Sequence, residues 1–181
     1  MRKYPKDFVV DVYEGNEKLR FLLGNRGKNT LFCVCINPSS ADNEFSDPTM
    51  NSLINVSKTK GFDSCIMINP APYRSNKPSM LPEKPDENLK KNLEVIERLF
   101  SENQGQTVLC GWGDYYLNGY KWFKESVDSI IECACRNQMK LVYIRKNRSG
   151  QPCHFSYLNY DHEVFNYGLG SYELKEYLPN K

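Results

Sequence analysis

Four short apolar segments, separated by stretches of helical character, constrain the fold of this chain more than any other feature. They are Leu31–Ile36, Cys65–Ile68, Thr107–Cys110 and Leu141–Ile144. Short continuous apolar runs are typical of strands that are buried on both faces of a parallel sheet. Parallel neighbours need crossover connections, which are usually helices, so the pattern predicts βαβ units with helices on both faces of the sheet.

Helix signals stand between these segments. Asp47 and Pro48 provide an N-cap and a first helical residue, and Gly61 ends the helix that they begin. Asp86 caps a second helix, whose apolar residues recur at helical spacing. A third helical region is expected from about Tyr115 to Cys135, whereas the proline-rich stretch Pro70–Pro85 is expected to be a long connection.

An antiparallel hairpin is predicted before the first buried strand. Residues Phe8 to Leu23 alternate between apolar and polar on either side of Gly15-Asn16, a typical turn sequence. A length of 181 residues suits one well-filled domain. We therefore predict a single domain over residues 1–181, a three-layer α/β/α fold with a central, mainly four-stranded parallel sheet and an N-terminal antiparallel hairpin.

Composition indicates a globular protein without a membrane segment. The chain is 40% apolar and 25% charged, and no apolar run approaches the roughly 20 residues that a spanning helix needs. No apolar segment of signal-peptide length follows the basic N-terminal residues, so a cytoplasmic location is expected. The net charge of +2 is too small to predict nucleic-acid binding by itself, so any basic surface has to be local.

The cysteines and glycines exclude several classes of site. Seven cysteines without a signal peptide indicate reduced thiols, and no C-x-x-C pair is present to suggest a zinc or iron–sulfur centre. Cys33 and Cys35 alternate along a strand and are expected to share one face as small apolar groups. Neither the P-loop nor the dinucleotide-binding glycine pattern occurs. No metal and no cofactor are predicted.

The residues that follow the predicted strands are the candidates for function, because ligands of open α/β sheets bind outside the carboxyl ends of the strands. These segments are Asn37–Asp42, Asn69–Arg74, Gly111–Asp114 and Arg145–Leu158. They resemble the motif series of the uracil-DNA glycosylase superfamily: CINPSSAD, GFDSCIMINPAPYRS, TVLCGWGDYYL and HFSYL stand in the order of that series. Phe155 departs from it, because the superfamily has proline after the histidine.

A closer resemblance is to the family called domain of unknown function 1643. Its L-N-P-S-x-A-D, D-P-T, N-x-x-x-x-R and G-x-P-x-H-x-x-Y-L elements match Ile36–Asp42, Asp47–Thr49, Asn69–Arg74 and Gly150–Leu158. This match covers nearly the whole chain, but the name of the family carries no activity.

The resemblance to the glycosylases implies roles for three catalytic candidates. Asn37 corresponds to an asparagine that positions water, Asp42 is the nearest carboxylate that would serve as a base instead, and His154 would donate a hydrogen bond to the departing base. Turn chemistry explains Asn37 equally well, since Asn-Pro-Ser-Ser also ends a strand. A loop histidine is also often an ordinary hydrogen-bonding group.

Two further sets of residues are predicted to bind the ligand. Those expected to contact a base or nucleotide are Pro38, Ser39, Phe45, Asn69, Tyr73, Arg74, Trp112 and Gly113. Those expected to contact DNA or a phosphate are Arg145, Lys146, Arg148 and Leu158. Leu158 stands where the glycosylases carry an apolar wedge for the duplex, although it and the candidate aromatic residues suit core packing as well.

Three functions remain open from the sequence. The first is a metal-independent N-glycosylase that acts on a uracil-like or modified base in DNA. The second is a non-excising protein of the same fold that binds a free nucleotide or nucleoside. The third is an interaction protein with a vestigial pocket, because a fold does not determine a function.

Overall fold

A mixed β-sheet forms the centre of the fold in the computed structural model, which describes residues 2–154 and 173–179. The strands are β2 (Val12–Gly15), β3 (Arg20–Gly24), β4 (Thr30–Val34), β6 (Ser64–Ile68), β7 (Thr107–Cys110), β8 (Lys140–Tyr143) and β9 (Lys175–Glu176). Their order in the sheet is β2-β3-β6-β4-β7-β8-β9. The α/β class predicted from the sequence is confirmed.

The sheet is larger and less regular than predicted. Its centre, β6-β4-β7-β8, is parallel throughout, as the apolar segments indicate. However, β3 pairs antiparallel with β6, so the predicted hairpin β2–β3 continues the sheet, with β2 as an edge strand. On the other side β9 pairs antiparallel with β8. The predicted sheet of mainly four parallel strands therefore corresponds only to the centre of the observed sheet, which is mixed because antiparallel strands extend it on both sides.

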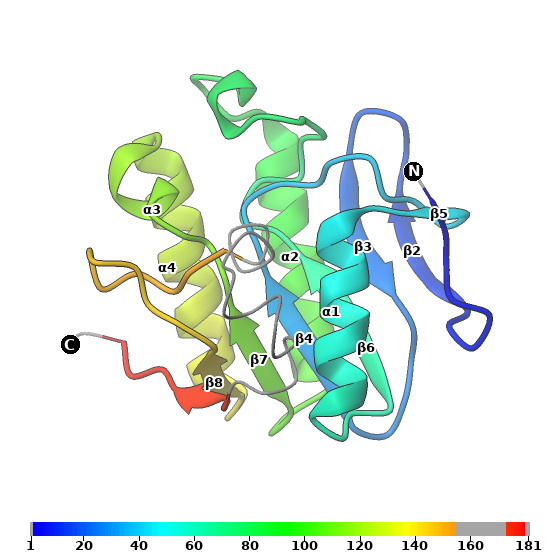
Figure 1. Cartoon of the computed structure of the whole chain (residues 1–181). Coiled ribbons are helices and arrows are strands. Elements are labelled where there is room, and N and C mark those ends of the chain that lie inside the picture. Colours follow the sequence, from blue (N-terminus) through cyan, green and yellow to red (C-terminus); the bar gives the residue numbers. More distant parts are fainter. Residues whose placement is uncertain (1, 155–172, 180–181) are drawn as a thin grey trace.

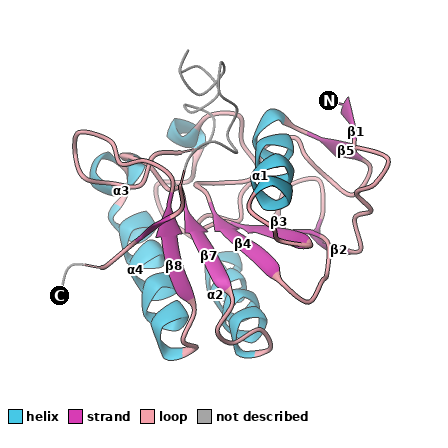
Figure 2. Cartoon of the chain, turned by 60° about the horizontal axis from the view of Figure 1, so that its bottom comes forward, coloured by secondary structure: helices cyan, strands magenta, loops and turns pink. Residues whose placement is uncertain are grey.

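Helices cover both faces of the sheet. The structure contains α1 (Pro48–Thr59), α2 (Glu87–Ser101), α3 (Tyr115–Asn118) and α4 (Lys121–Arg136), with a short 3-10 turn at Pro78–Met80. Helix α1 packs on one face, whereas α2 and α4 lie side by side on the other (Figures 1 and 2). No helix of the described ranges combines the length and the apolar character that crossing a membrane requires.

The helical region predicted from Tyr115 to Cys135 is interrupted, and this prediction is corrected. Gly119 has an extended backbone and ends α3 with a hydrogen bond from its N–H to the carbonyl oxygen of Tyr115, at 2.8 Å. A Cβ atom at Gly119 would lie only 2.5 Å from that oxygen. The extended backbone at Gly119 interrupts the helical conformation, so a separate helix, α4, begins at Lys121.

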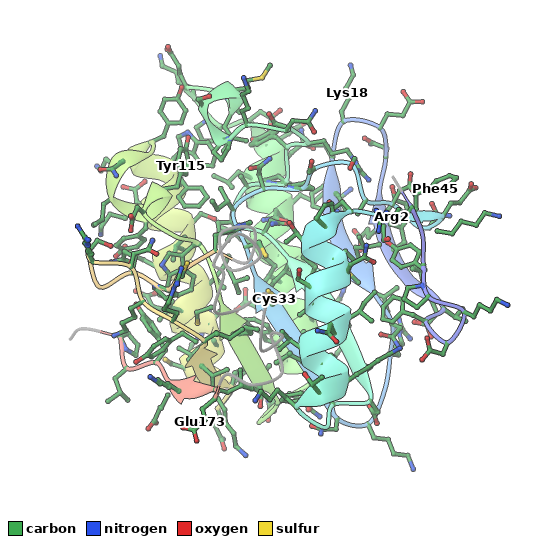
Figure 3. The ribbon with its side chains drawn as sticks, viewed as in Figure 1. Arg2, Lys18, Cys33, Phe45, Tyr115 and Glu173 are labelled. Atoms are coloured by element: carbon green, nitrogen blue, oxygen red, sulfur yellow. The ribbon has the colours of Figure 1, made fainter. Side chains whose placement is uncertain are left out.

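The apolar core lies on both faces of the parallel strands. Side chains of successive strand residues point to opposite faces, so Phe32 and Val34 of β4 pack towards α2 and α4, whereas Leu31 and Cys33 pack towards α1. Cys33 lies near the middle of the molecule (Figure 3). All residues of β4 are buried, which explains why Leu31–Val34 appear in the sequence as an uninterrupted apolar run.

A second, two-stranded sheet joins the N-terminal residues to the segment before α1. Strand β1 (Arg2–Lys3) pairs antiparallel with β5 (Phe45–Ser46), and Arg2 and Phe45 are labelled close together in Figure 3. The hydroxyl of Ser46 donates to the carbonyl oxygen of Arg2, and the hydroxyl of Tyr4 donates to that of Asp42 at 2.6 Å. The first residues therefore hold the segment that leads into α1.

Candidate functional site

A pocket of about 250 Å³ lies at the carboxyl ends of the central strands, where ligands of α/β sheets bind. Strands β3 and β6 contribute Arg20 and Met67 to its wall, and the segment directly after β4 contributes Cys35, Ile36 and Asn37. Loops and the beginning of α1 contribute Ser39, Asp47, Thr49, Ser75, Asn76, Pro78 and His154. Two of the three catalytic candidates, Asn37 and His154, therefore line one pocket although they are far apart in the sequence.

Asn37 is held rigidly by the backbone around it. Its Nδ2 atom donates to the carbonyl oxygens of Pro38 at 2.9 Å and Ser75 at 2.8 Å, with a longer contact of 3.5 Å to that of Tyr73. Because these carbonyls occupy the amide nitrogen, the Oδ1 atom is the part of the side chain that remains to accept a hydrogen bond. Asn37 thus joins two loops and also offers an acceptor at the pocket.

Arg20 is a buried cation in the wall of the pocket, with 1% of its surface exposed. It donates through Nη1 to the carbonyl oxygen of Ala41 at 3.0 Å and through Nη2 to Asn69 Oδ1 at 3.3 Å, whereas its Nε has no partner. Burial lowers the pKa of Arg20 to about 10, and the charge of Asp47 acts in the opposite direction. A buried charge needs such compensation, so Asp47 is its electrostatic partner.

Asp47 has a second role at the beginning of α1. Its Oδ1 accepts the backbone N–H of Met50 at 2.8 Å, which is the N-cap bond that the sequence predicts. Asp47 and Thr49 both line the pocket, so the N-terminal end of α1 forms part of its wall. The same carboxylate therefore caps the helix and faces a buried guanidinium.

His154 reaches the pocket because a short hairpin brings it there. The N–H of Cys153 donates to the carbonyl oxygen of Arg145, and the N–H of Gly113 donates to that of Pro152 at 2.9 Å. Gly113 has φ of +61°, which glycine tolerates best, and a Cβ atom there would approach His154 Cβ to 3.6 Å. In the pocket, the side chain of His154 is hydrogen-bonded to that of Cys35.

Cys33 and Cys35 are buried in the same apolar cluster, as the sequence predicts, but Cys35 has a further position that the sequence does not predict. It is buried but lines the pocket, and its Sγ lies 3.5 Å from Cys33 Sγ. The hydrogen bond with Cys33 lowers the pKa of Cys35, and the hydrogen bond and charge of His154 and the charge of Arg20 act in the same direction against burial. The pKa of Cys33 is raised, mainly by burial. Of these two thiols, Cys35 is therefore the one that loses its proton first and carries the negative charge.

Asn69 lies beside Arg20 and does not line the pocket. Its side chain is buried, its Oδ1 accepts from Arg20, and its Nδ2 has no partner. Its backbone oxygen accepts a hydrogen bond from Asn92 Nδ2 at 2.8 Å. The geometry gives Asn69 a supporting position beside the guanidinium, although the sequence predicts that it reads a base.

The other predicted base-binding residues lie around the pocket, and most of them stabilise its walls. Tyr73 donates to Asp86 Oδ1, and Trp112 is buried and donates to Gln151 Oε1. Arg74 uses Nε, Nη1 and Nη2 on the backbone oxygens of Asn16, Ser39 and Ala41 and on the hydroxyl of Tyr13. It thereby fastens the loop after β4 to the hairpin.

Two predicted residues, Asp42 and Phe45, lie between β4 and α1 and do not line the pocket. Asp42 Oδ1 accepts the N–H groups of Glu44 and Phe45, which makes it the anchor of a turn. Phe45 belongs to β5. Of the nearby predicted residues, Ser39 lines the pocket, and its hydroxyl donates to Asn76 Oδ1, whereas Pro38 is buried next to Asn37.

The residues predicted to contact DNA or a phosphate differ in their surroundings. Arg145 is partly buried and donates to Cys153 Sγ, and the Lys146 ammonium lies over the rings of Tyr143 and Tyr177, 5.0 Å and 5.6 Å from their centroids. Arg148 is exposed. Leu158, the predicted wedge, lies outside the described residues.

Comparison with known proteins identifies a family. A family model described as protein of unknown function (DUF1643) matches residues 20–154, which include every residue that lines the pocket. Neither a curated protein nor a solved structure matches the chain.

Proposed function

The chain belongs to the DUF1643 family, whose description gives no activity, and from the pocket itself we propose that it is an N-glycosylase of the uracil-DNA glycosylase kind, with the corresponding fold. The pocket would take a single extruded base, and water would cleave the bond between the base and its sugar. One observation carries this proposal: Asn37, with its amide nitrogen fixed by backbone carbonyls, lines the same small pocket as His154.

The two residues would divide the chemistry between them. Asn37 Oδ1 accepts a hydrogen bond from the attacking water and orients it, since an amide is too weak a base to remove its proton. His154 donates a hydrogen bond to the carbonyl oxygen of the base, on which negative charge develops as the bond breaks. A preorganised donor of this kind is worth on the order of 10²–10³ in rate.

The size of the pocket limits the substrate. A volume of about 250 Å³ is below the usual range for pockets that hold drug-sized ligands, roughly 300–1,000 Å³. A monocyclic base therefore fits better than a complete dinucleotide. Contacts with the edge of the base would come from groups in the wall, Ser39 and Asn76, rather than from the buried Asn69.

The experiment that tests this proposal is excision from oligonucleotides that carry uracil, hypoxanthine or a hydroxymethylated pyrimidine. Cleavage of the strand at the resulting abasic site measures the reaction. Asn37→Ala should lower kcat by about tenfold or more while binding changes little, because the water loses its acceptor. The exposed Asn118→Ala is the matched control and should keep full activity. Absence of excision from all three substrates would contradict the proposal.

A second function is the binding of a free nucleotide without excision. It is favoured because two of the basic residues predicted to bind DNA phosphates interact with other side chains of the protein. Arg145 and Lys146 already contact Cys153 and two tyrosine rings, which leaves Arg148 as the more available cation of the predicted cluster. A protein that contacts several DNA phosphates loses affinity steeply as salt rises. Salt-insensitive binding of a mononucleotide, together with undetectable binding of duplex, would favour this second function.

A further inference from the structure

The pocket contains a thiol and an imidazole that the proposed hydrolysis does not use as a pair. Cys35 and His154 are hydrogen-bonded to each other and both line the pocket. Arg20, whose Nε has no partner and whose side chain is 1% exposed, contributes to the same wall. A thiol beside an imidazole and a guanidinium has the surroundings of a nucleophilic cysteine.

Comparison with a neighbouring cysteine shows what these surroundings do to the thiol of Cys35. Cys65 lies on the adjacent strand β6, is buried in the same apolar cluster and does not line the pocket. Burial raises the pKa of Cys65 to about 12, and it has neither the imidazole nor the guanidinium beside it. The pKa of Cys35 moves downwards instead, because Cys33, His154 and Arg20 together outweigh burial.

The charges that face Cys35 come from several elements. Arg20 lies on β3 and Asp47 at the beginning of α1, and the protonated Cys33 lies two residues earlier in the same segment. Asp47 opposes a thiolate, but it also offsets the charge of Arg20 and is bonded to the N–H of Met50. The hydrogen bonds from Cys33 and His154 go directly to Cys35, and they decide the balance.

We propose that Cys35 and His154 form a nucleophilic pair that adds reversibly to carbon 6 of a pyrimidine ring held in the pocket. This inference rests on the proposed base pocket and narrows its substrate class to pyrimidines, whose double bond between carbons 5 and 6 is conjugated to a carbonyl. A thiolate is a soft nucleophile that suits such a carbon. Purines offer no equivalent conjugated double bond.

The step balances without an oxidant or a co-reactant. Cys35 transfers its proton to His154, and the thiolate sulfur forms a bond to carbon 6 of the ring. The electron pair of the double bond moves onto the carbonyl at carbon 4 as an enolate, and the imidazolium of His154 returns the proton to carbon 5. Reversal by loss of either hydrogen from carbon 5 regenerates the thiolate and the ring, so solvent hydrogen enters at carbon 5.

Alkylation of the cysteines, in the wild-type protein and in one variant, tests the nucleophile. Iodoacetamide reacts with thiolates, and mass spectrometry measures the rate at each cysteine. The exposed Cys135 is the internal reference, because it lies outside the pocket and the thiolate is the species that iodoacetamide alkylates. Cys35 should already react at its maximal rate near neutral pH, and His154→Gln should move its profile towards that of Cys135. Coincident profiles, or an unreactive Cys35, would overturn the proposal.

Exchange of hydrogen at carbon 5 tests the substrate class. Deoxyuridine monophosphate in heavy water should lose the proton NMR signal of that hydrogen when the protein is added. Cys35→Ser should abolish the exchange, and Cys65→Ser, the buried control outside the pocket, should retain it. Excision without exchange would overturn the covalent step alone. Exchange without excision would support the covalent step and contradict the hydrolysis, so the two proposals fail separately.

Discussion

Arg20 is a cation that has almost no access to water, so the cost of replacing it depends on what fills its space. In Arg20→Met the apolar side chain occupies much of the same volume, and the carbonyl of Ala41 keeps its bond from Arg74 Nη1 at 3.0 Å. Asn69 Oδ1 loses its donor and Asp47 loses the cation that it compensates, so we expect the free energy of unfolding to fall by about 1–3 kcal/mol, the usual cost of a buried polar group left without its partner.

Arg20→Ala is the contrasting variant, because it leaves a cavity as well as removing the charge. Truncation of a long buried side chain to alanine typically costs about 2–5 kcal/mol. Urea unfolding of both variants measures the difference, and binding of a pyrimidine nucleotide should weaken in both. Equal destabilisation by Met and Ala would show that the hydrogen bonds of the guanidinium, and not its volume, hold this wall.

At the scale of the element, two aspartates cap helices but differ in their surroundings. Asp47 accepts the N–H of Met50 at the start of α1 and faces Arg20, whereas Asp86 accepts the N–H of Asn88 at the exposed start of α2. Loss of an N-cap costs about 0.5–2 kcal/mol. We expect Asp86→Ala to cost about 1 kcal/mol and Asp47→Ala clearly more, because the latter also leaves a buried cation without its partner.

Urea unfolding at neutral pH measures both losses. The double variant Asp47→Ala/Arg20→Met provides the control, since it removes the cation that Asp47 compensates. If the excess cost of Asp47→Ala comes from Arg20, this double variant should be less destabilised than the sum of its single changes. An additive result would assign the whole cost to the cap.

The sequence predicts an element well where its residues are buried in a regular pattern. The four parallel strands are found because both of their faces are covered, and the caps at Asp47 and Asp86 follow from side-chain chemistry. Strand β9 has no such signal, because Lys175 and Glu176 are exposed. The break before α4 is missed because apolar residues continue at helical spacing after Gly119.

The same reasoning finds only part of the site. Asn37 and His154 are found because they follow strands of the parallel sheet or belong to a family motif. Arg20 is missed because it comes from the antiparallel β3, to which the rule on carboxyl ends does not apply. A charged residue at the start of the apolar sequence RFLLG is the signal that identifies it. Cys35 is missed because a buried thiol resembles any other small apolar group until its neighbours are known.

For the molecule as a whole, partly buried phenols predict a loss of stability in alkali. Burial raises the pKa of Tyr73 and of Tyr177 to about 12, compared with about 10 in an unfolded chain. The folded protein therefore keeps protons that the unfolded chain releases. The stabilisation is complete below about pH 10 and is lost as pH rises from about 10 towards 12.

Urea midpoints measured on both sides of pH 10 check this expectation. The buried thiol of Cys65, whose pKa is also about 12, contributes in the same direction. Replacing both tyrosines with phenylalanine should therefore reduce the alkaline loss without removing it. A midpoint that stays constant from about pH 9 to pH 11 would contradict the prediction.

The pairing of β1 with β5 has a practical consequence for anyone who works with this protein. Residues 2–4 hold the loop that leads to Asp47, so we expect a purification tag joined directly to the N-terminal end to disturb one wall of the pocket. Lys175–Glu176 lie at the opposite edge of the sheet from the hairpin, beside β8. A tag, fluorophore or surface-immobilisation handle is therefore better attached at the C-terminal end, where it leaves the entrance to α1 undisturbed.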